Sequence, residues 1–141
     1  DIVLRVRNNS SGYYDQNYTP PMPMVAAPVS DVRQSASTAV SFIIDTGADL
    51  TLLRSDVADE VDLWNDTAGR LHVVGIGGIP AIRQLYNALV EIAGETVLVT
   101  ADCRDDIDED ILGRDAINEF TLTICAKRDQ VVFERVEDPQ P

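Results

Sequence analysis

Short apolar segments alternate with polar or glycine-containing turns along most of the chain. Val, Ile, Leu and aromatic residues dominate these segments, and this pattern is typical of β-strands. We expect strands at residues 2–7, 24–29, 39–44, 51–53, 73–78, 81–86, 88–92, 96–100, 121–126 and 131–136. Short strands with frequent turns indicate an all-β domain of the sandwich or barrel type.

The turns between these strands predict which strands pair as hairpins. The expected hairpins are 24–29 with 39–44, 73–78 with 81–86, 88–92 with 96–100, and 121–126 with 131–136. One or two short helices complete the domain. Ser55 suits the N-cap position of a helix over residues 55–61, because acidic residues follow it in the first turn. A second short helix is expected to begin at Arg114.

The N-terminal part of the chain has a different composition. Residues 8–23 are polar, rich in tyrosine and interrupted by three prolines, so we expect a loop there. We therefore divide the chain into an N-terminal extension, 1–23, and one domain, 24–141. A chain of 141 residues can bury one hydrophobic core but is too short for two independent ones.

Charge limits the partners that this chain can have. The sequence contains 24 acidic and 11 basic residues, for a net charge of −13. Such a surface repels nucleic acid phosphates and anionic lipid headgroups, so neither partner is expected. No apolar run is long enough to span a membrane. We expect a soluble, cytoplasmic domain, which could have been cut from a longer protein.

Cysteine and histidine usage argues against several hydrolase mechanisms. Cys103 and Cys125 are far apart and are expected to be reduced thiols. With His72 they are too few for a structural zinc site, which needs four ligands at short spacings. A Ser–His or Cys–His nucleophile would have to use His72, which lies in a strand-like segment. Serine, cysteine and zinc hydrolase chemistry are therefore disfavoured.

The best candidate for a catalytic group is Asp45. It follows the apolar run Phe42–Ile44 and opens a tight turn, Asp45-Thr46-Gly47. A carboxyl at the end of a buried strand lies near apolar walls, and burial or a second carboxylate raises its pKa. Two further glycine-containing motifs follow along the chain, Gly75-Ile76-Gly77-Gly78 and Ile111-Leu112-Gly113-Arg114-Asp115.

In this order the three motifs resemble those of the retropepsins, the single-domain aspartic proteases of retroviruses and their cellular relatives. The resemblance extends from about residue 24 to about residue 133. It implies a closed retropepsin-like β-barrel or sandwich with a flap hairpin. It also implies a homodimer acting on peptide or protein substrates, because each chain supplies one catalytic aspartate. The two Asp45 carboxylates would share a proton and activate a water between them, without a metal or cofactor.

The same resemblance implies a role for each motif residue. The catalytic turn would comprise Asp45, Thr46 and Gly47, with Thr46 bracing the two turns across the dimer interface. Gly47 would let the substrate backbone approach closely. Substrate contacts would come from the remaining turn and flap residues: Ala48, Asp49, Leu50, Gly75, Ile76, Gly77 and Gly78. Arg114 would support the site by pairing with Asp49.

Two alternatives remain open at this point. The chain could be a catalytically silent retropepsin-like module that dimerises or binds peptides. It could also be an acidic metal-binding domain, because six acidic residues crowd one segment: Asp102, Asp105, Asp106, Asp108, Glu109 and Asp110. A calcium loop usually has a central glycine, which this segment lacks. A solvated acidic loop is therefore the favoured interpretation, and beside a cleft it would disfavour acidic substrates.

Overall fold

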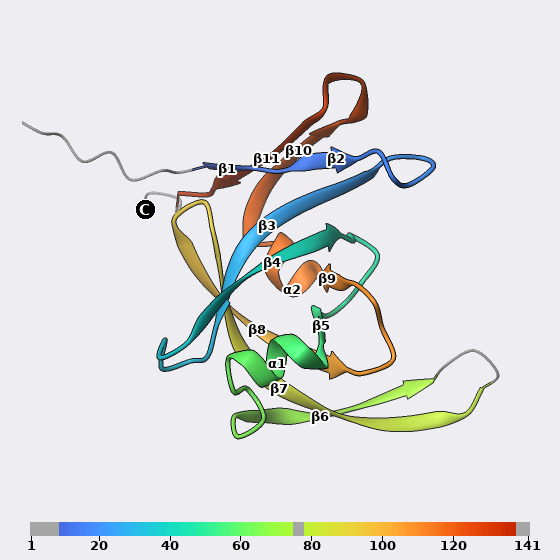
Figure 1. The fold of residues 1–141 in the computed structure, drawn as a ribbon, viewed down its shortest axis with the longest axis vertical. Coiled ribbons are helices and arrows are strands. Elements are labelled where there is room, and N and C mark those ends of the chain that lie inside the picture. Colours follow the sequence, from blue (N-terminus) through green and yellow to red (C-terminus); the bar gives the residue numbers. More distant parts are fainter. Residues whose placement is uncertain (1–8, 75–77, 138–141) are drawn as a thin grey trace, which may run out of the picture.

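The computed structural model describes residues 9–74 and 78–137, and Figure 1 shows their arrangement. Eleven strands in these ranges form two sheets. The smaller sheet has the order β1 (Asn9–Ser11), β11 (Gln130–Arg135), β10 (Phe120–Cys125). The larger sheet has the order β2 (Tyr13–Asp15), β3 (Met22–Ser30), β4 (Ser37–Ile44), β9 (Asp110–Leu112), β5 (Leu52–Arg54), β8 (Glu95–Arg104), β7 (Pro80–Ile92), β6 (Thr67–Val74). Two short α-helices, α1 (Ser55–Glu60) and α2 (Arg114–Ile117), and one 3₁₀ turn, η1 (Ala126–Arg128), connect the strands.

The larger sheet curves around the hydrophobic core. Strand β3 pairs along its length with β4 and also pairs with β7 at Val29↔Val90, so the sheet bends back on itself. Alternate side chains of β3 point inward, because Val25 and Val29 are fully buried while Ala26 and Pro28 between them are exposed. Both α-helices and the smaller sheet contribute to the same core, through Val57, Ala58, Ala116, Ile117, Phe120 and Phe133.

Much of the architecture agrees with the sequence analysis. The mostly-β class is confirmed, as are the short helices at residues 55 and 114. The N-cap of α1 is Arg54 rather than the predicted Ser55, and no side chain caps the helix. The expected pairings of 24–29 with 39–44, 88–92 with 96–100 and 121–126 with 131–136 correspond to β3–β4, β7–β8 and β10–β11. The strand expected at residues 2–7 and the hairpin tip at residues 75–77 lie outside the described residues.

The loop predicted for residues 8–23 is wrong over part of its length. Strand β1 pairs with β11, and β2 pairs with β3. The chain passes from one sheet to the other at Gly12, whose N–H donates to the Val131 carbonyl at 2.8 Å. A Cβ atom at Gly12 would lie 2.0 Å from the Met24 carbonyl oxygen, so only glycine fits. Strands β1 and β2 are short and polar, so no apolar pattern in the sequence reveals them. They are stabilised by pairing with β11 and β3.

The second correction concerns strands predicted on either side of Asn87. They form one continuous strand, β7, and its partner β6 begins at Thr67 rather than at residue 73. Asn87 does not end the strand, because its backbone is paired with Thr100 of β8, and its side chain donates to Asp66 at 3.0 Å. Strand β7 pairs with β8 only from Leu85 onward, whereas residues 80–84 pair with β6 alone. We call this projecting hairpin, residues 67–74 and 78–84, the arm (Figure 1).

Candidate active site

Asp45 lies at the end of β4, where the strand gives way to a tight turn. The adjacent strand β9 runs parallel to β4, and the Asp45 N–H donates to the Leu112 carbonyl at 3.1 Å. The Asp45 carbonyl accepts the Ala48 N–H at 3.1 Å, and its Oδ1 accepts the Gly47 N–H at 2.9 Å. The half-buried carboxylate is therefore fixed by the backbone of its own turn.

Arg114, at the start of α2, ties this turn to the segment after β9. Its backbone N–H donates to the Ala48 carbonyl at 2.9 Å, and its Nη1 donates to the Thr46 carbonyl at 2.7 Å. Its Nη2 donates to the Asp49 carboxylate. A planar guanidinium can hold several acceptors at fixed angles, so the Arg114 side chain orients two parts of the turn while its backbone N–H holds a third.

A buried polar network behind the turn was not expected from the sequence. Thr51 is fully buried, and its hydroxyl donates to Asp115 Oδ1 at 2.7 Å while its N–H donates to Asp115 Oδ2 at 3.1 Å. The same hydroxyl accepts the Gly113 N–H at 3.2 Å. A Cβ atom at Gly113 would lie 2.4 Å from the Leu50 carbonyl carbon. The sequence signal for this network is Thr51 directly before the apolar pair Leu52 and Leu53. A threonine buried with such a pair is removed from water, so its hydroxyl needs a hydrogen-bond partner within the protein.

The structure gathers part of the expected site on one turn. Thr46, Gly47 and Asp49 are exposed, and Ala48 and Leu50 are half-buried. Gly78 is exposed and lies in the arm with φ +72°, a conformation that favours glycine. No hydrogen bond within residues 9–74 and 78–137 joins Gly78 to the turn. Three expected residues, Gly75, Ile76 and Gly77, lie outside the described residues.

The acidic segment at residues 102–110 is not uniformly solvated, so that prediction is partly wrong. Asp102 in β8 and Asp110 in β9 are buried, with 6% and 4% of their surface exposed. Asp102 forms ion pairs with Arg83 at 3.0 Å and Arg104 at 3.3 Å, and Asp110 pairs with Arg54 at 3.1 Å. These arginine partners make the burial tolerable, and two of them come from other strands, Arg83 from β7 and Arg54 from β5. The four remaining acids are exposed as expected: Asp105, Asp106, Asp108 and Glu109.

These contacts also change the titration of individual groups. The hydrogen bond from Arg104 lowers the pKa of Asp106 to about 2, and the bond to Asp106 raises the pKa of Arg104. Burial and the nearby charge of Asp102 raise the pKa of the Cys103 thiol to about 12. A thiol with such a pKa is protonated at neutral pH, so Cys103 is a poor nucleophile.

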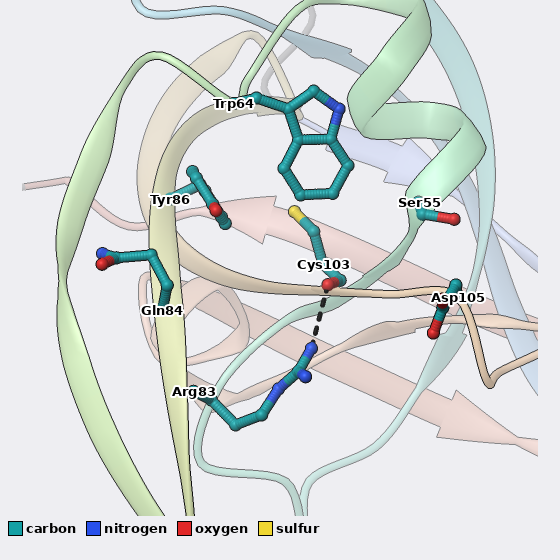
Figure 2. Close-up of a pocket in the computed structure, with 7 residues that line it drawn as sticks. All are labelled: Ser55, Trp64, Arg83, Gln84, Tyr86, Cys103 and Asp105. Atoms are coloured by element: carbon teal, nitrogen blue, oxygen red, sulfur yellow. Dashed lines mark hydrogen bonds between the residues drawn. The ribbon is translucent and has the colours of Figure 1, made fainter.

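Figure 2 shows a separate pocket of about 390 Å³ at the foot of the arm, where β7 begins to pair with β8. The Trp64 and Tyr86 rings meet edge to face on one side of it, with their centroids 5.1 Å apart. The remaining lining residues are Ser55, Arg83, Gln84, Cys103 and Asp105. No residue of the Asp45 turn lines this pocket, so it is distinct from the candidate catalytic centre.

Within residues 9–74 and 78–137 no group of three or more His, Cys, Asp and Glu side chains is arranged to hold a metal ion. Neither α-helix described there is long and apolar enough to cross a membrane.

Comparisons with known proteins agree with this fold. The family model described as retroviral aspartyl protease matches residues 21–125. A solved retropepsin-like aspartic protease from Rickettsia conorii superposes with a TM-score of 0.59 at 15% identity, covering 90% of each chain. EIAV protease, solved in complex with the inhibitor HBY-793, gives a TM-score of 0.50 at 19% identity, covering 69% of this chain and 86% of its own. A comparison with curated proteins gives no match.

Proposed function

Because the chain belongs to the retroviral aspartyl protease family, we propose that it is an aspartic endopeptidase that is active as a homodimer. The observation that carries this proposal is the Asp45-Thr46-Gly47 turn. It presents a half-buried carboxylate whose Oδ1 is held by the Gly47 N–H at 2.9 Å. A carboxylate fixed in this way is suited to act on a water or a substrate carbonyl without first reorganising.

The dimer follows from the number of catalytic groups. Each chain has one Asp-Thr-Gly sequence, so a pair of carboxylates requires two copies of the turn. Two carboxylates in hydrogen-bond contact cannot both be ionised, and they share one proton. The ionised Asp45 then takes a proton from the bound water, while the protonated Asp45 of the second copy donates a hydrogen bond to the scissile carbonyl. Within the described residues no donor contacts Asp45 Oδ2, which leaves that oxygen available for the shared proton.

The residues around Asp45 suit an extended peptide. A substrate strand can hydrogen-bond to backbone groups of the turn and the arm, as in other cases of β-strand addition. Gly47 has no Cβ to obstruct that strand, and Asp49 is exposed beside it with its carboxylate oriented by Arg114. Leu50 gives the adjoining surface an apolar character. We therefore expect cleavage between bulky apolar residues.

The test is the variant Asp45→Asn, which keeps the shape of the side chain and removes its acid–base function. We expect cleavage of a peptide library across pH 3–8 to fall at least about 100-fold, with an unchanged circular dichroism spectrum. Asp62→Asn is the matched control, because Asp62 is exposed and has a positive φ that asparagine tolerates. Sedimentation over a concentration series would measure the dimer.

Two results would count against the proposal. An Asp45→Asn protein that cleaves as fast as the wild type would exclude the mechanism. A proven wild-type dimer that binds peptides at every pH without cleaving any would instead favour the catalytically silent module.

A further inference from the structure

The arm separates at Leu85 from the rest of the described protein, which we call the body. From that residue onward β7 pairs with β8, whereas residues 80–84 pair only with β6, which has no other partner strand in the described ranges. The arm also presents apolar side chains to solvent, with Leu71 40%, Ile79 77% and Ile82 60% exposed. Its orientation therefore depends on the few contacts at its foot.

The side-chain hydrogen bonds from the arm to β8 come from Arg83. Its Nε donates to Asp102 Oδ1 at 3.0 Å, and its Nη2 donates to the Cys103 carbonyl at 3.1 Å. Figure 2 shows the second of these bonds, at the edge of the pocket described above. Strand geometry explains the first, because Arg83 lies on the same face of β7 as Leu85, which is paired with Asp102.

Asp102 holds a second guanidinium as well. Arg104, two residues further along β8, contacts Asp102 Oδ2 at 3.3 Å and also pairs with Asp106 at 2.7 Å. One buried carboxylate thus separates two positive charges, one on the arm and one on the body. If that negative charge were removed, the two guanidinium groups would repel each other across the joint between arm and body.

We propose that Asp102 and Arg83 are positioning residues that set the orientation of the arm relative to the catalytic turn. The inference rests on the proposed function only for its effect on substrate, since Gly78 of the arm is a proposed substrate contact. Neither residue touches the reacting atoms. Their role is to keep the arm in one orientation before substrate binds. Binding then does not have to order the arm, so the substrate binds more tightly.

The chain contains a matched control for this pair. Arg54 and Asp110 form a similar pair between a partly exposed guanidinium and a buried carboxylate, at 3.1 Å. That pair joins β5 to β9 within the body and does not involve the arm. A variant of Arg54 therefore reports the general effect of disturbing a buried ion pair.

The experiment compares Asp102→Asn, Arg83→Lys and Arg54→Lys in the full chain. NMR order parameters of backbone amides 81–84, measured without substrate, should be about 0.85 in the wild type and below about 0.6 in Asp102→Asn and Arg83→Lys. In Arg54→Lys they should stay at the wild-type value. Asp102→Glu, which retains the charge, should recover most of the wild-type order.

Kinetics on the best peptide of the library give the second readout. Asp102→Asn and Arg83→Lys should raise KM about tenfold and leave kcat within about threefold, because substrate binding must now order the arm. Unchanged order parameters in both variants would overturn the inference, and so would an equal loss of order in Arg54→Lys. If Asp102→Asn does not fold, Arg83→Lys decides the question. A wild-type protein without protease activity would contradict the proposed function, while the order parameters would still test the role of the pair.

Discussion

The Asp45 turn, residues 45–50, and the arm are held in place in different ways. Hydrogen bonds join residues 112–115 to the turn and to Thr51, which follows the turn and is fully buried. The arm has exposed side chains on the described parts of both strands, and its foot is joined to β8 by the Arg83 side chain.

This difference has a physical consequence. Each buried hydrogen bond of the turn is costly to break, because an unpaired polar group in the interior cannot return to water. The backbone around Asp45 is therefore expected to keep one geometry. The arm loses fewer buried contacts when it moves, because most of its described side chains are exposed to solvent and its hydrogen bonds to β8 come from Arg83. A substitution that is damaging in the turn should accordingly be tolerated in the arm.

The largest effect is expected from adding one methyl group to the segment behind the turn. In Gly113→Ala the new Cβ would lie within 2.4–2.9 Å of three backbone atoms of Leu50 and Thr51. These atoms cannot move away without breaking the hydrogen bonds of the turn. We expect the free energy of unfolding, measured with urea, to fall by about 3 kcal/mol.

The arm offers the same substitution as a control. Gly69→Ala meets no atom within 4 Å, although its φ of +128° strains an alanine. A loss of about 1 kcal/mol is expected there. Equal losses at the two positions would contradict the proposed difference between the turn and the arm.

A smaller effect is expected from Thr51→Val, which keeps the shape of the side chain. The change removes the hydroxyl that bridges Asp115 and Gly113. The buried Gly113 N–H then has no partner, whereas Asp115 Oδ1 still accepts the Ala116 N–H at 3.0 Å. We expect a loss of roughly 2 kcal/mol in the free energy of unfolding. In the arm, Thr67→Val should change it by less than about 0.5 kcal/mol, because Thr67 is exposed. A neutral Thr51→Val would show that the network does not hold the turn.

The smallest effect is expected from polar substitution in the arm itself. Ile82→Ser removes an apolar side chain that is 60% exposed and should leave the free energy of unfolding within about 0.5 kcal/mol of the wild type. Leu98→Ser in β8, where the leucine is 58% exposed, is the matched control in the body. A loss well above 1 kcal/mol for Ile82→Ser alone, in thermal or urea unfolding, would show that the arm packs against the rest of the protein.

Local patterns were sufficient for most strands and for the Asp45 turn. Apolar runs ending in polar or glycine-containing turns predicted β4 and the hairpins, because residues adjacent in sequence also pack together in these elements. The prediction failed where a distant partner was decisive. Strands β1 and β2 form on edges supplied by β11 and β3, and β7 continues through Asn87 because that residue pairs with Thr100 of β8.

The sequence alone determined the strand pattern, the family resemblance and the presence of one Asp-Thr-Gly turn per chain. Only the tertiary structure decided that Asp102 and Asp110 are buried beside arginines and that Thr51 and Asp115 support the turn. The physical reason is that an acidic or hydroxyl side chain has no fixed environment of its own. Strand pairing brings it to solvent or to a buried partner, and these pairings join residues far apart in the sequence.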